Sequence, residues 1–188
     1  MASLAHLAVG VAAGRLAAGK RHLGASLLCA SLSMLPDADV VAFLFGIPYA
    51  HPFGHRGASH SIVFALCCGI LAWGLTRARR GRAWRWGGTV TLTVLSHPLL
   101  DMLTTGGLGV ALWWPASDAR VFFPVRMIPV APIGLGMLSP RGLQVVLTEL
   151  GPSIPLLIWA AWPIRVGQPQ DSGDQGRVSR SRSDASEP

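Results

Sequence analysis

The segment WGGTVTLTVLSHPLLDMLTT, residues 86–105, consists mainly of apolar and small residues and carries a single acidic residue, Asp101. A helix that crosses a membrane needs about 20 predominantly apolar residues. The whole chain of 188 residues is 51% hydrophobic and 13% charged, whereas charged residues make up about 25% of a typical soluble domain. This composition predicts an integral membrane protein.

Apolar segments of this kind recur along the chain. They are residues 3–19, 22–47 (broken near Pro36), 60–76, 86–105 and 143–163. We therefore expect an all-α fold, a polytopic membrane helix bundle with about five transmembrane segments, as one domain over residues 1–166. The Gly-, Pro- and Trp-rich connector 106–142 predicts an interfacial or re-entrant segment. The polar tail 167–188 is expected to be disordered.

Basic residues lie beside the apolar segments, and their positions predict the topology. A net charge of +7 is compatible with nucleic-acid binding, but no RNA-binding motif or DNA-reading helix accompanies the arginines, so no nucleic-acid partner is expected. The positive-inside rule places loop 77–85, the turn at Lys20 and Arg21, and the end at Arg165 in the cytoplasm. The N-terminus is then outside and the C-terminal tail cytoplasmic.

Histidines and aspartates fall at one depth of this expected bundle. At 1.5 Å per residue, four segments that run in alternating directions bring them to the outer half of the bilayer or its outer surface. An ionised aspartate in a membrane helix costs about 2.5–3.5 kcal/mol, so a paired cation or a bound metal must offset that cost. The residues at this depth are His6, Asp37, Asp39, His55, His60, His97 and Asp101.

Three short motifs supply most of these residues: LPDAD (35–39), HRGASH (55–60) and SHPLLD (96–101). In the last motif, His97 and Asp101 are four residues apart and share a helix face. Imidazole and carboxylate ligands together suit zinc, manganese or iron. The alternatives are a His–Asp hydrogen bond that packs helices and a solvated loop or helix cap at LPDAD. Taken together, the motifs predict a site for one or two divalent ions, with zinc as the first choice.

Other polar residues have less specific interpretations. Arg56 could bind a phosphate or a carboxylate through two hydrogen bonds, or contact a lipid headgroup. His51 is interpreted as interfacial, and Glu149 either joins the site or balances an arginine. Gly10 and Gly14 would allow another helix to approach closely. The three cysteines lie in apolar segments without a CxxC pair, which favours small buried residues over a zinc or redox motif.

The order of the motifs resembles the YdjM-like family of membrane-bound metal-dependent hydrolases, which is associated with the LexA-regulated SOS response. The resemblance covers roughly residues 3–163 and rests on HxxxG at His6, then LPDAD, HRGASHS, and HPLLD followed by TTGG. It implies that the metal ligands are His6, Asp37, Asp39, His55, His60, His97 and Asp101. A more remote similarity relates the early histidine and the HxxxD element to zinc-dependent phospholipases C and P1-type nucleases.

These inferences predict a metal-dependent hydrolase at the outer face of the inner membrane. The expected substrate is a phosphoester of a lipid or a lipid-linked molecule, with a soluble small molecule left open. By analogy with the zinc phospholipases, Asp101 would bridge two ions, and Asp37, His55 and Arg56 are the predicted catalytic residues. Asp37 or Asp39 would act as general base, whichever is not a ligand. The alternatives are a metal-binding or ion/proton transport protein without hydrolysis, and a structural membrane protein.

Overall fold

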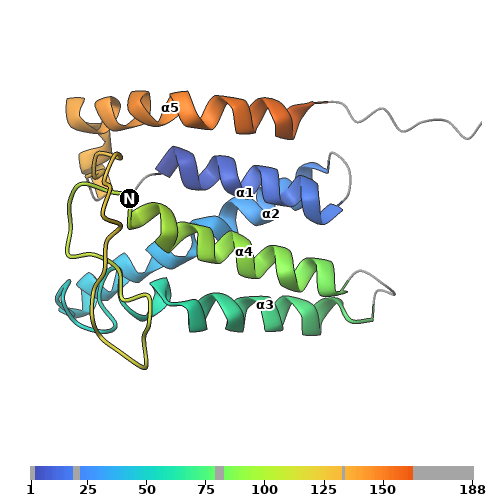
Figure 1. Ribbon diagram of the computed structural model, residues 1–188, viewed down its shortest axis with the longest axis horizontal. Helices are drawn as coiled ribbons and strands as arrows, with labels where there is room; N and C mark the ends of the chain where they lie inside the picture. Colours follow the sequence, from blue (N-terminus) through green and yellow to red (C-terminus); the bar gives the residue numbers. More distant parts are fainter. Residues whose placement is uncertain (1–2, 19–21, 79–82, 133, 163–188) are drawn as a thin grey trace, which may run out of the picture.

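The computed structural model describes residues 3–18, 22–78, 83–132 and 134–162, and every helix or strand element within these ranges is a helix, which confirms the all-α class (Figure 1). Five α-helices are present there: α1 (Ser3–Ala18), α2 (Leu23–Ser33), α3 (Ile62–Thr76), α4 (Ala83–Asp101) and α5 (Pro140–Ala161). Three 3-10 helices complete the description: η1 (Leu35–Phe45), η2 (Ala58–His60) and η3 (Gly134–Leu138). Each expected apolar segment thus forms helix.

The break near Pro36 is confirmed. The axes of α2 and η1 differ by 44°, and Met34 both ends α2 and precedes η1. A proline has no N–H to donate to the preceding turn, so the helix stops there and a new one starts with Pro36 in its first turn. This break directs Asp37 of LPDAD into the protein, where its side chain is buried.

The expected number of five membrane crossings is not confirmed. Helix α5 is long and apolar enough to cross a membrane, and the bent pair of α2 and η1 passes the same test only if it counts as one span. Helices α1 and α3 have 16 and 15 residues, which corresponds to lengths of about 24 and 22 Å, short of the roughly 30 Å of a bilayer core. By length and composition, one or two of the described helices therefore meet the requirement for a span.

Close helix packing at small residues holds the bundle together. A Cβ atom at Gly10 would lie 2.5 Å from Ala30 Cα and 2.6 Å from the Cys29 carbonyl oxygen, so α1 and α2 touch at their backbones. Gly14 makes the same kind of contact with Ser26, which confirms the expected close approach of a neighbouring helix. Helix α1 also packs against α4 and α5, and α3 packs against α4.

The cysteine prediction holds for one residue and is wrong for another. Cys29 is buried between α1 and α2, as expected, whereas Cys67 is exposed on α3. The reason is that α3 packs through the face that carries Ala65 and leaves its opposite side, including Leu66 and Ile70, exposed. An apolar segment predicted from sequence does not show which of its faces has a protein neighbour.

The connector between α4 and α5 covers one end of the bundle, where α4 ends and α3 begins (Figure 1). It has an irregular backbone with buried residues Val110, Ala111 and Leu112, and it is joined to the rest by hydrogen bonds such as Ile62 N–H to the Leu112 carbonyl, 3.0 Å. Exposed Trp113 and Met127 lie on the same connector. The expected polar tail 167–188, Lys20, Arg21 and Arg165 lie outside the described residues.

Candidate metal centre

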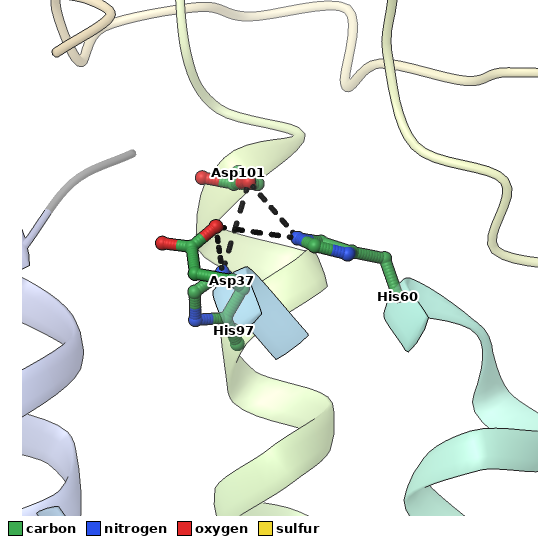
Figure 2. A group of neighbouring side chains, drawn as sticks. All are labelled: Asp37, His60, His97 and Asp101. Carbon is green, nitrogen blue, oxygen red and sulfur yellow. Dashed lines mark ion pairs between the residues drawn. The ribbon is translucent and has the colours of Figure 1, made fainter. Parts of the chain in front are cut away.

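Four side chains from three helical elements converge at the covered end of the bundle (Figure 2). Asp37 comes from η1, His60 from η2, and His97 and Asp101 from the last turns of α4. Each offers one ligand atom, and these atoms lie within 4.8 Å of one another. All four side chains are at most 5% exposed. We call this set the four-residue centre.

The spacing of the ligand atoms matches a small coordination shell. Asp37 Oδ1 lies 3.3 Å from His97 Nε2 and 3.7 Å from His60 Nε2. Asp101 Oδ2 lies 3.6 Å from His60 Nε2 and 3.9 Å from His97 Nε2. Ligands bound tetrahedrally at about 2.0–2.2 Å are roughly 3.3–3.6 Å from one another. Two of the four distances fall in this range and two are slightly longer, so the four-residue centre could hold a metal ion.

The hydrogen bonding of His97 leaves the correct nitrogen for a metal. Its Nδ1 atom lies 2.7 Å from the Ser33 carbonyl oxygen, at the end of α2. A carbonyl only accepts, so Nδ1 donates its hydrogen there and Nε2 is the nitrogen that faces the centre. Nε2 is buried and has no hydrogen-bond partner among the described residues. Metal-binding histidines in proteins are held in this way by a carbonyl or carboxylate.

His60 is oriented in the same way by a carboxylate. Its Nδ1 atom lies 3.1 Å from Asp39 Oδ2 and 2.9 Å from Ser59 Oγ. Because Ser59 donates its hydroxyl hydrogen to Asp39, the imidazole N–H is directed at this pair and Nε2 faces the centre. Like that of His97, this Nε2 atom is buried and lacks a hydrogen-bond partner in the described part of the chain.

Asp39, predicted as a ligand, lies outside the four-residue centre. Its carboxylate is 2.6 Å from His55 Nδ1 and accepts the Arg56 backbone N–H at 3.1 Å. It also accepts the Ser59 hydroxyl and lies 3.1 Å from His60 Nδ1. Asp39, His55 and His60 are close enough to form a second ligand group. Their facing atoms are already joined by hydrogen bonds, however, so we interpret Asp39 as the carboxylate that orients both histidines.

Arg56 is buried and contacts a carboxylate of the protein, so of its two predicted alternatives the headgroup contact is not the one observed. It is 1% exposed, and its Nε atom forms an ion pair with Asp101 Oδ2 at 2.9 Å. Its Nη1 atom donates to Thr104 Oγ1 and to the Gly106 carbonyl, both at 3.1 Å. The residue has a φ of 62°, a conformation that a non-glycine residue seldom adopts. Arg56 thus binds a carboxylate, as one alternative predicted, from inside the protein.

His6 lies beside the four-residue centre. Its ring stacks on that of His97 with centroids 3.8 Å apart, and its Nε2 atom is 3.6 Å from Asp101 Oδ1. Both ring nitrogens are buried without hydrogen-bond partners among the described residues. Within those residues His6 belongs to no group of three or more close ligand atoms. The structure thus brings all seven predicted ligands together: four form the four-residue centre, Asp39 and His55 adjoin it at His60, and His6 adjoins it at His97 and Asp101.

Two residues at this end have roles that sequence reasoning did not find. Arg120, in the connector, donates to the carbonyl oxygens of Tyr49, His51 and His55 at 3.0–3.1 Å. Burial lowers the pKa of Arg120, yet arginine titrates so far above neutrality that the group stays charged. Glu149 accepts the N–H groups of Leu4 and Ala5, at 2.8 and 3.2 Å, and so caps α1 instead of joining the site.

The family described as YdjM inner membrane protein matches residues 1–165. The chain belongs to the YdjM family. It is 44% identical over 154 residues to the Inner membrane protein YbcI of Escherichia coli (strain K12), a match that covers 78% of this chain and 87% of that protein. No solved structure matches it.

Membership of the YdjM family confirms the resemblance predicted from the order of the motifs, and it identifies the chain as an inner membrane protein. Neither the description of the YdjM family nor the name of the E. coli relative states an activity. The chemistry of the site therefore rests on the residues themselves.

Proposed function

We propose that this protein is a metal-dependent hydrolase that cleaves a phosphoester of a lipid or lipid-linked substrate at the outer face of the inner membrane. The observation that carries the proposal is the convergence of His60 Nε2, His97 Nε2 and the Asp37 carboxylate, all buried and without hydrogen-bond partners in the described ranges. Buried polar groups in proteins are nearly always satisfied, and a cation satisfies this set.

The ion would be held by Asp37, His60, His97 and Asp101. Zinc is our first choice because two imidazoles and two carboxylates suit it, and manganese and iron are the alternatives. A divalent ion bound there would supply Lewis-acid activation of a water molecule and of the phosphoryl group. His6, next to Asp101 Oδ1, is the residue that would help hold a second ion. The rest of the chemistry belongs to the side chains around the centre.

His55 is the residue to which we assign proton transfer. It donates Nδ1–H to Asp39, 2.6 Å away, which leaves Nε2 as the nitrogen for proton transfer. Its ring is close to the centre, since Nδ1 is 3.9 Å from Asp37 Oδ1. A histidine held by a carboxylate is a common general base. Asp37 is the alternative base, because its second oxygen is also without a hydrogen-bond partner in the described structure.

Arg56 would steady the phosphoryl group. Its Nε and Nη1 atoms are engaged by Asp101, Thr104 and Gly106. Its Nη2 atom has no hydrogen-bond partner among the described residues. A guanidinium fixed in this way keeps a donor for a phosphoryl oxygen without any movement of the side chain.

For the topology, we propose five crossings with the centre toward the outer face and the C-terminal tail in the cytoplasm. Arg77 follows the C-terminal end of α3, whereas His60 immediately precedes its N-terminal end. In α4, likewise, the basic residue Arg85 lies at the end away from the centre and Asp101 lies at the end that forms it. The positive-inside rule therefore supports a cytoplasmic end at Arg77 and Arg85 and an outer end at the centre.

The second candidate function is metal binding or ion transport without hydrolysis. It is favoured by the complete burial of His60, His97 and Asp101, each 0% exposed. A transport path also needs polar groups on the opposite side of the bundle. There, Arg15 is buried with its guanidinium 4.7 Å from the centre of the Trp159 ring, a contact that stabilises helix packing. This favours a site at one face over a path through the protein.

The deciding experiment combines metal analysis with a hydrolysis assay on the same purified protein. We expect bound divalent metal together with release of phosphate or headgroup from phospholipid vesicles or from a water-soluble phosphodiester. Metal without any hydrolysis would replace the hydrolase proposal by the metal-binding one. Absence of metal after supplementation with zinc, manganese and iron would contradict both.

A further inference from the structure

A groove of about 420 Å³ lies beside the centre, between the loop that precedes α3, the first half of α3 and the connector. Its walls include Phe53, Val63, Cys67 and Trp114, and its polar residues are Asp39 and Ser59. Ligand pockets in proteins have volumes of this order and are lined mostly by apolar side chains with a few polar groups.

The polar end of the groove touches the hydrogen-bond network of the centre. Asp39 accepts the Ser59 hydroxyl at 2.6 Å and lies 3.1 Å from His60 Nδ1. His60 in turn presents Nε2 to the four-residue centre. One imidazole ring therefore separates the groove from the proposed metal position.

The other end of the groove reaches the exposed side of α3. Val63 and Cys67 are four residues apart and share one helix face. Val63 is 43% exposed, and Leu66, Ile70 and Leu71 continue an exposed apolar surface along the helix. In an inner membrane protein such a surface faces lipid chains. The groove therefore opens sideways toward the bilayer.

The lining favours a hydrocarbon chain over a polar ligand. Asp39 and Ser59 already use their polar atoms on each other and on the two histidines. The Asp39 carboxylate also repels an anion, so a phosphoryl group would not reside in the groove itself. An apolar chain needs no hydrogen bonds, and the aromatic rings of Phe53 and Trp114 offer it packing surface.

We propose that this groove binds one acyl chain of a membrane phospholipid and that the headgroup of the same lipid lies toward the metal centre. The reactive part of this inference rests on the proposed hydrolase function, whereas the binding of the chain does not. Substrate then enters from the bilayer at the side of α3, and the outer aqueous phase receives the released headgroup.

The test uses full-length protein in phosphatidylethanolamine–phosphatidylglycerol vesicles that contain a trace of phosphatidylglycerol with a diazirine on one acyl chain. After illumination, peptide mass spectrometry locates the adducts. We expect labelling of Val63, Cys67 and Trp114 at least about fivefold above that of Ile70 and Leu71. Even labelling along the exposed side of α3, as ordinary surrounding lipid would give, overturns the inference.

Matched tryptophan variants fill or spare the groove. Val63→Trp places a large ring in the groove and should reduce labelling at Trp114 at least about fivefold, whereas Ile70→Trp, on the exposed side of α3 outside the lining, should leave it unchanged. Unchanged labelling in Val63→Trp contradicts the inference. The positions of the adducts in the wild-type protein do not depend on the folding of either variant. They therefore test the binding of the acyl chain by themselves.

The same samples separate this inference from the proposed function. Labelling requires no turnover, so labelling in the groove without phosphoester hydrolysis supports the chain site while the hydrolase proposal fails. Hydrolysis of bis(p-nitrophenyl) phosphate without preferential labelling supports the hydrolase and overturns the chain site.

Discussion

Arg56 and Asp101 form a buried ion pair, with 2.9 Å between Nε and Oδ2 and with side chains that are 1% and 0% exposed. The same Asp101 oxygen faces His60 and His97. Asp101 therefore pairs with a buried arginine and also belongs to the four-residue centre, so the proposed metal site gives it two roles. The two roles can be separated by mutation.

Asp101→Ala should both destabilise the protein and abolish metal binding. Removing one partner of a buried ion pair costs about 3–5 kcal/mol because the other charge stays buried and unpaired. In the double variant Arg56→Met/Asp101→Ala the unpaired charge is gone, so thermal stability in detergent should partly recover while metal content stays low. Recovery of metal in the double variant would show that Asp101 is not a ligand.

Asp39→Asn should weaken metal binding without abolishing it. The amide can still accept a hydrogen bond, but it no longer stabilises the imidazoles of His55 and His60 with a negative charge. Loss of such an orienting carboxylate typically lowers metal affinity about 10- to 100-fold. Titration against a chelator measures the change, with Asp118→Asn on the exposed part of the connector as the control. A complete loss of metal would instead make Asp39 a direct ligand.

Arg120→Ala should loosen the loop that carries His55. Its guanidinium holds three backbone carbonyls of that loop, and a hydrogen bond to a charged group contributes about 1.5–3 kcal/mol, less where water competes. We expect a lower thermal midpoint and weaker metal binding than in Arg126→Ala, since the guanidinium of Arg126 lies 4.0 Å from the centre of the Phe122 ring. Equal effects of the two substitutions would contradict this role.

Gly10→Leu should destabilise the bundle, because even a Cβ atom there would lie 2.5 Å from Ala30 Cα. Overpacking of this kind costs about 1–3 kcal/mol or more. Gly74 in α3 is the matched control, since no atom lies within 4 Å of a Cβ at that position. Gly74→Leu should leave the thermal midpoint unchanged or raise it, given the better helix propensity of leucine. A tolerated Gly10→Leu would mean that α1 and α2 are not packed closely.

The sequence was sufficient to predict the helices and the convergence of the histidines and aspartates at one end of the bundle. The apolar segments predicted where the helices lie, Pro36 predicted the break between α2 and η1, and the shared depth of His60, His97 and Asp101 predicted their convergence. The prediction succeeded because a helix rises by a fixed distance per residue. The number of residues between the basic residues at one helix end and a histidine or aspartate therefore gives the position of that side chain along the bundle.

The distinction between Asp37 and Asp39 could not be predicted from the sequence. It depends on which carboxylate accepts the N–H groups of His55 and His60. Both histidines follow a loop that is held by Arg120 of the connector, a contact between distant segments. Arg120 and Glu149 escaped prediction for the same reason, because their partners are backbone groups from distant segments. The number of membrane crossings depends on helix lengths, and α1 and α3 are shorter than a full span.

We propose that a divalent ion is bound by His60, His97, Asp37 and Asp101. Metal analysis of three purified proteins tests this most directly: wild type, His97→Ala and His51→Ala. His51 is exposed in the same loop region and lies outside both ligand groups, which makes it the control. We predict about one equivalent of metal in wild type and in His51→Ala, as a single tetrahedral site requires, and less than about a tenth of that in His97→Ala. Equal metal content in all three proteins would contradict the account.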